Sequence, residues 1–142
     1  MRYNICRILA LAAVCVAGTM QGRTLKGYAV ATQAGDMGVQ IDSVAFRDDV
    51  TRIYGKLTGK PHTSNRIDRF SLVLPSGVEY VAEDIDGVDM ERWFQWEESG
   101  EIMLEVDFPT MKPIDKFGLK TSGPKGASEW NVNRRTYKAK KK

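Results

Sequence analysis

The chain has 142 residues, of which 42% are hydrophobic and 27% charged, and its formal net charge is +3. It contains two cysteines, Cys6 and Cys15, and one histidine, His62. So few nitrogen and sulfur ligands argue against a zinc site and against catalysis built on histidine. A chain of this length favours a single domain.

The first 22 residues have the layout of a secretory signal peptide. Two arginines give a basic start, an uninterrupted apolar run covers 8–17, and small residues follow. The run is shorter than the roughly 20 apolar residues that a membrane span needs. We therefore predict that 1–22 direct export to the periplasm or the extracellular space and are removed. Lipid anchoring at Cys15 is disfavoured, because Val14 stands where a small residue is expected.

Removal of this leader would change the chemistry of the mature chain. Both cysteines leave with it, so a disulfide framework and a cysteine nucleophile are excluded. Residues 23–38 are weakly patterned and are predicted to be a linker or an edge strand. Beyond them, apolar and polar residues alternate in short runs that predict β-strands. These runs are Val39–Phe46, Thr51–Thr58, Ile67–Leu74, Val78–Ala82, Met90–Glu97, Glu101–Phe108, Phe117–Thr121 and Glu129–Val132.

Turn signals separate several of these strands. Pro75-Ser76-Gly77 predicts one hairpin, and Glu98-Ser99-Gly100 predicts another that joins the strands on either side of it. Inside the first run the apolar phase changes, which predicts a β-bulge near Asp42-Ser43. The apolar phases also place Trp96 and Trp130 in the core.

The predicted fold is an antiparallel β-sandwich of immunoglobulin type over 39–133, with about seven to eight strands. A small β-barrel is the alternative. The turns and strand phases resemble those of small exported bacterial proteins that carry an immunoglobulin-like domain. The resemblance covers Val39 to Val132 and implies a sandwich and an envelope location, without catalytic residues. It rests on Val39-Gln40-Ile41, Thr51-Arg52-Ile53-Tyr54-Gly55, Ser76-Gly77-Val78-Glu79-Tyr80 and Ser99-Gly100-Glu101-Ile102.

An acidic segment covers Glu83–Glu98, where seven acids accompany one base, Arg92. Four of the acids stand at near-alternating positions around Gly87, and calcium takes six to eight oxygen ligands. They predict a weak calcium site, for which the alternative is a polar turn leading into a strand. The four are Asp84, Asp86, Asp89 and Glu91.

Trp93 is the candidate contact residue. Alternation directs Phe94 and Trp96 inward, which leaves Trp93 on the polar side of its strand. An outward indole can stack on a sugar ring, a peptide or an aromatic ligand. The alternative is that the preceding loop or a second layer covers it. The predicted contact surface consists of Tyr80, Glu91, Trp93 and Gln95.

The charge is distributed unevenly along the chain. Residues 23–133 hold 13 Lys and Arg against 18 Asp and Glu, whereas 134–142 hold six basic residues and no acid. We expect this tail to be disordered, to bind an anionic surface such as lipid, or to fold back on the acidic segment. Nucleic acid binding is disfavoured, because no basic, aromatic-bearing folded surface stands behind the tail.

These observations favour a non-enzymatic binding or interaction module of the bacterial envelope, with a protein or a glycan as its partner. No cofactor other than calcium is expected, and the mature chain has no transmembrane segment. One alternative is a small calcium-dependent or carboxylate-based glycan hydrolase, because glycoside hydrolysis needs only two suitably spaced carboxylates. Another is a structural subunit of an envelope assembly.

Overall fold

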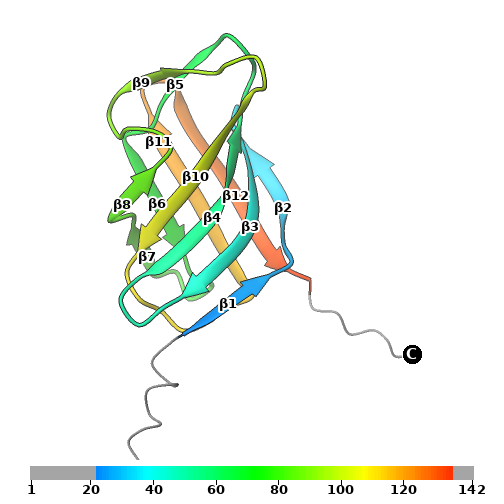
Figure 1. The fold of residues 1–142 in the computed structure, drawn as a ribbon, viewed down its shortest axis with the longest axis vertical. Helices are drawn as coiled ribbons and strands as arrows, with labels where there is room; N and C mark the ends of the chain where they lie inside the picture. The colour runs from blue at the N-terminus through cyan, green and yellow to red at the C-terminus, as the bar shows by residue number, and fades with distance from the viewer. Residues whose placement is uncertain (1–21, 136–142) are drawn as a thin grey trace, which may run out of the picture.

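The computed structural model describes residues 22–135 and shows an all-β protein (Figure 1). The predicted leader up to Gln21 and the tail beyond Arg135 lie outside these residues. Twelve strands form two five-stranded antiparallel sheets and one two-stranded ribbon. The first sheet has the order β1-β3-β4-β10-β8, the second has the order β2-β12-β11-β6-β7, and the ribbon pairs β5 with β9.

The strand bounds show how the chain moves between the sheets. The first sheet contains β1 (Arg23–Lys26), β3 (Gly38–Phe46), β4 (Thr51–Thr58), β8 (Asp84–Asp86) and β10 (Glu101–Phe108). The second contains β2 (Tyr28–Ala34), β6 (Arg69–Val73), β7 (Glu79–Val81), β11 (Lys116–Gly123) and β12 (Gly126–Arg134). The ribbon consists of β5 (Ser64–Arg66) and β9 (Trp93–Gln95).

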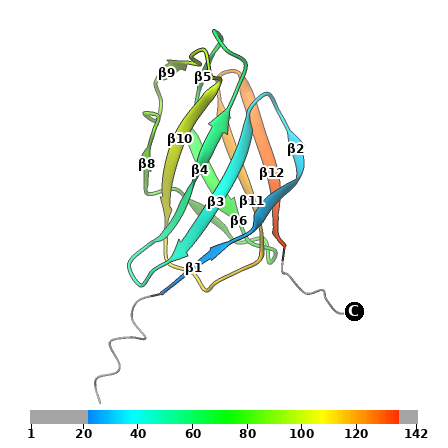
Figure 2. The ribbon, with the colours of Figure 1, turned by 45° about the vertical axis from the view of Figure 1, so that its right-hand side comes forward.

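The two sheets lie face to face as the layers of a sandwich (Figures 1 and 2). Aromatic rings connect the layers: Phe70 of the second sheet lies edge-on to Phe108 of the first, with ring centroids 6.1 Å apart. Trp130 adds a third ring, 6.5 Å from Phe70. Trp96 and Trp130 are both fully buried, which confirms that they belong to the core.

Neither sheet closes on itself within the described residues, so the barrel alternative is wrong and the all-β, antiparallel prediction is confirmed. The prediction of seven to eight strands is wrong, because β1, β2, β5 and β8 were not counted as separate strands. Three of them, β1, β5 and β8, are three or four residues long and carry too few alternations to be distinguished from a loop, and the seven-residue β2 is weakly patterned. Within residues 22–135 there is also no helix that could span a membrane.

The bulge predicted near Asp42-Ser43 is confirmed. The register between β3 and β4 shifts between Ile41 and Ser43. Gly55 lies opposite Ile41, and a Cβ atom at Gly55 would come within 2.1 Å of the Gln40 carbonyl oxygen. The bulge therefore presses the β3 backbone so close to β4 that only glycine fits there.

One predicted hairpin forms and the other does not. The turn at 75–77 joins β6 to β7, and the Leu74 amide donates to the Val78 carbonyl at 2.8 Å. The turn at 98–100 also forms, since the Gly100 amide donates to the Glu97 carbonyl at 3.0 Å. However, it does not join a hairpin, because β10 pairs with β4 and β8 and not with β9. Strand β9 pairs with β5 instead.

The two N-terminal strands extend opposite sheets of the same sandwich. Strand β1 forms an edge of the first sheet and β2 an edge of the second. Leu25 and Tyr28 bring buried side chains into the core. The Tyr28 hydroxyl donates to the Ile114 carbonyl at 2.7 Å, and burial raises the pKa of Tyr28 to about 12. Residues 23–34 are therefore part of the packed structure.

Candidate functional site

The ribbon of β5 and β9 lies at one end of the sandwich, at the top of Figures 1 and 2. Its register pairs Ser64 with Gln95, Asn65 with Phe94, and Arg66 with Trp93. Directly paired residues project from the same face of an antiparallel pair. Because Asn65 is buried, the Asn65–Phe94 pair faces inward, and Arg66 and Trp93 share the outer face.

Trp96 anchors the ribbon from the inside. Its side chain is fully buried, and its indole Nε1 donates to the Asn65 Oδ1 at 2.6 Å. The Phe94 ring packs edge-on against it, with centroids 5.3 Å apart. A Cβ atom at Gly59 would fall 2.1 Å from the Trp96 ring, so the chain passes the indole without room for a side chain. These contacts fix the ribbon on the sandwich.

Two residues with left-handed backbones precede the two ribbon strands. His62 has φ 68° and Glu91 has φ 62°, values that are uncommon outside glycine. Each is held by a backbone hydrogen bond of 2.8 Å, from the His62 amide to the Trp96 carbonyl and from the Glu91 amide to the Ile67 carbonyl. Strain of this kind persists only where the surroundings impose it, and it is enriched at functional sites.

Trp93 projects from this fixed ribbon into solvent. Its side chain is 53% exposed, in contrast to the buried Trp96 and Trp130. Beside it lies an open hollow of about 410 Å³. Charged groups contributed by Asp86, Asp89 and Arg92 line it together with the indole. The complete lining is Ile85, Asp86, Gly87, Val88, Asp89, Arg92, Trp93 and Phe94.

The chemistry of this hollow suits a ligand that has both a flat apolar face and several hydroxyl or amine groups. The Trp93 ring offers a surface for stacking. The carboxylates of Asp86 and Asp89 accept hydrogen bonds, and the guanidinium of Arg92 donates them. Among the described residues, none of these three charged side chains takes part in an ion pair. Their hydrogen-bonding groups therefore face water.

The predicted contact surface divides between two places. Trp93 and Gln95 project from the outer face of β9, and Glu91 lies in the turn that leads into it. Tyr80 lies elsewhere, on β7, where it pairs with Leu72 and packs against the core. In Figure 1, β9 lies at the top of the sandwich, whereas β7 lies in its lower half. The structure therefore does not bring Tyr80 to Trp93.

The four residues of the predicted calcium site lie on β8 and in the loop that follows it. Asp84 and Asp86 project outward from β8 on either side of the half-buried Ile85. Asp89 and Glu91 follow in the loop between β8 and β9. Within residues 22–135, no three Asp, Glu, His or Cys side chains come close enough together to share a metal ion.

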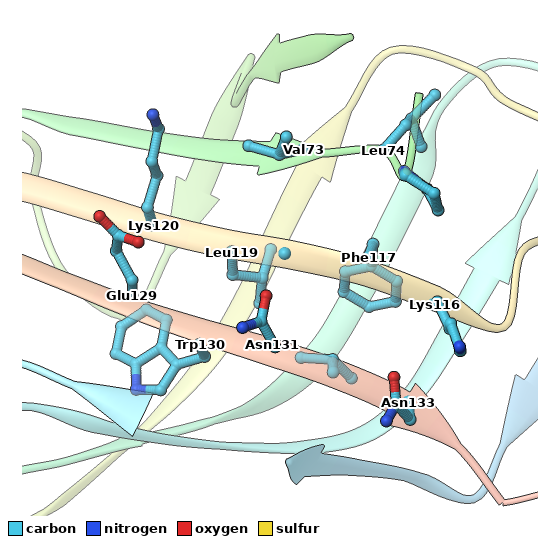
Figure 3. A pocket seen from close by; sticks show the side chains of 13 residues that line it. Val73, Leu74, Lys116, Phe117, Leu119, Lys120, Glu129, Trp130, Asn131 and Asn133 are labelled. Atoms are coloured by element: carbon cyan, nitrogen blue, oxygen red, sulfur yellow. The ribbon is translucent and has the colours of Figure 1, made fainter. Parts of the chain in front are cut away.

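A second hollow, of about 440 Å³, lies on the outer face of the second sheet (Figure 3). It opens above Gly118, whose missing side chain leaves space between Val73 and Asn131. Sequence reasoning missed this hollow, although a glycine at an outward position between Lys116 and Lys120 was a usable signal. It is lined by Val73, Leu74, Pro75, Lys116, Phe117, Gly118, Leu119, Lys120, Glu129, Trp130, Asn131, Val132 and Asn133.

Comparison of the chain with protein-family models, with curated proteins and with solved structures finds no match.

Proposed function

We propose that this protein is an exported, non-enzymatic binding module of the bacterial envelope, and that the hollow beside Trp93 binds a glycan. The leader-like pattern of residues 1–22 supports export. The order of the strands supports a module of immunoglobulin type. Strands β3-β4-β10-β8 follow the A-B-E-D order of one immunoglobulin sheet, and β12-β11-β6-β7 follow the G-F-C-C′ order of the other. Strands β1 and β2 are additions at the edges.

The exposure of Trp93 is the observation that carries the proposal. At 53% exposure, Trp93 forgoes part of the roughly 1.5–3 kcal/mol that full burial of a large apolar side chain contributes. The chain nevertheless holds this indole on a rigid ribbon, anchored by Trp96 and Asn65. A rigid aromatic side chain loses little conformational entropy on binding. Trp93 therefore stands on an anchored backbone, from which its exposed indole can stack on a ligand.

The polar lining favours a glycan over an apolar ligand. Sugar rings present an apolar face of C–H groups together with hydroxyls at the ring edge. In the hollow, Trp93 matches the first feature, and Asp86, Asp89 and Arg92 match the second. An amino sugar would gain further from the two carboxylates, because its ammonium group would pair with them.

The test is retention of the purified protein on bacterial envelope glycans. Insoluble peptidoglycan and immobilised envelope polysaccharides serve as the probes. We expect the wild-type chain to be retained on at least one of them, and Trp93→Ala to lose at least tenfold in affinity while staying folded. The matched control is Val81→Ala, which truncates another exposed apolar side chain, on the second sheet. Equal retention of Trp93→Ala and wild type, or no retention of the wild type on any glycan, would contradict the proposal.

A further inference from the structure

A row of paired residues crosses the outer face of the first sheet from one edge to the other. Lys26 pairs with Ser43, Ser43 with Tyr54, Tyr54 with Glu105, and Glu105 with Asp86. All five strands of the sheet contribute one residue each. Since paired residues project from the same face, the five side chains form a continuous line across the sheet.

The acidic half of this row is hollowed and carries unpaired charge. Asp42, Tyr54, Asp86, Met103 and Glu105 line an open depression of about 240 Å³. Met103 is 70% exposed, the highest value among the large apolar side chains described. Among the described residues, the three carboxylates take part in no ion pair. Glu105 and Asp86 stand directly opposite each other, an arrangement of like charges that destabilises a sheet.

Other acids on the outer face of the same sheet are paired with cations, so unpaired negative charge is not a general feature of that face. Arg52 donates two hydrogen bonds to Asp107, at 2.6 and 2.9 Å. Lys56 lies 3.2 Å from Glu101. These two acids therefore have cationic partners on β4, whereas Glu105, between them on β10, faces Tyr54. The row is left with an excess of negative charge beside exposed apolar surface.

The C-terminal end of β12 lies beside the opposite end of this row. The Arg135 amide donates to the Gly27 carbonyl at 2.8 Å, and the Arg134 Nε donates to the Lys26 carbonyl at 2.8 Å. The seven residues that follow, Thr136 to Lys142, contain four lysines and no acid. The row covers four interstrand spacings, about 19 Å, and seven extended residues reach about 23 Å. The length of the remaining chain therefore suffices to cross the face.

We propose that residues 136–142 dock across the outer face of the first sheet of their own chain, with lysine side chains on Asp42, Glu105 and Asp86. Tyr137 gives the segment an aromatic ring to pack against the exposed apolar surface of the row. Each exposed ion pair contributes only about 0–1 kcal/mol. Tethering makes such weak contacts effective, because a short linker gives the segment a local concentration in the millimolar range.

The test compares the full chain with a variant of the same length that carries Lys138→Gln, Lys140→Gln, Lys141→Gln and Lys142→Gln. Methyl and amide NMR signals are recorded at low salt and at about 0.5 M salt. We expect the variant to shift the signals of Met103, Tyr54, Glu105 and Asp86 relative to the wild type at low salt. High salt should remove these differences, because it screens exposed charges. Asp86 lines both this depression and the hollow beside Trp93, but the readout requires no ligand at Trp93, so failure of the docking proposal and failure of the glycan proposal are distinguishable.

Two further variants separate the row from the rest of the surface. The double change Glu105→Gln and Asp86→Asn should abolish the salt-dependent difference at Met103, and the matched control Glu129→Gln, on the outer side of the second sheet, should leave it unchanged. Identical spectra of the wild type and the lysine variant at low salt would overturn the proposal. So would differences that map to the second sheet. Differences that grow with protein concentration would place the segment on a second copy and would overturn docking within one chain.

Discussion

Trp93 and Trp96 stand three residues apart on one short segment, yet one is exposed and the other is buried. Trp96 is fully buried, and its indole N–H is satisfied by Asn65 at 2.6 Å. Trp93 is 53% exposed and adjoins a polar hollow. The same residue type therefore provides an anchor on the inner side of the ribbon and an open surface on the outer side. The comparison therefore distinguishes the side chain that anchors the ribbon, Trp96, from the side chain that the ribbon exposes to solvent, Trp93.

The largest expected effect is at the anchor. Replacing Trp96 by alanine removes a fully buried aromatic side chain and leaves a cavity, a change that typically costs about 3–5 kcal/mol. Trp93→Ala should change the free energy of unfolding by less than about 0.5 kcal/mol, as expected for an exposed position. Urea denaturation measures both. Similar losses for the two variants would show that the inner and outer sides of the ribbon do not differ as described.

A smaller loss is expected at the hydrogen-bond partner of the anchor. Asn65→Ala leaves the buried Trp96 N–H without an acceptor, which costs about 1–3 kcal/mol. In Trp96→Phe no indole N–H remains, so adding Asn65→Ala to that variant should cost less than adding it to the wild type. A double-mutant cycle from urea denaturation measures this coupling. Strictly additive losses would argue that the hydrogen bond contributes nothing.

The smallest expected effect is a change in the quenching of tryptophan fluorescence. The chain has three tryptophans, and Trp96 and Trp130 are at most 1% exposed. Acrylamide should therefore quench one component of the tryptophan fluorescence strongly and the remainder weakly. Trp93→Ala should remove the strongly quenched component and leave the other. A strongly quenched component that persists in this variant would place a second indole in contact with solvent.

The sequence predicts side-chain phases far better than strand partners. Alternation in Glu101–Phe108 and around Trp96 identifies which side chains are buried, because the period of two is a local property of a strand. The phase change near Asp42 identifies a bulge for the same reason. The partner of Trp93–Gln95 is not predictable in this way, since β9 pairs with β5, from which three other strands separate it in sequence, and not with the adjacent β10.

The candidate site shows the same division. Alternation predicts that Trp93 and Gln95 share a face, and the register of the ribbon agrees. It does not predict that Tyr80 lies apart from Trp93, because that separation depends on β9 pairing with β5, a strand distant in sequence. The row from Lys26 to Asp86 is likewise invisible in the sequence, since its members come from five strands brought into register only by the fold.

The most direct test of the central claim is protection of Trp93 by a bound glycan. Soluble fragments of an envelope glycan that retains the protein are titrated into the wild-type chain, and acrylamide quenching is measured at each step. The account predicts that the strongly quenched component becomes shielded in proportion to occupancy, because the sugar ring covers the indole. Binding of the glycan without any change in quenching would show that Trp93 is not the contact residue and would contradict the account.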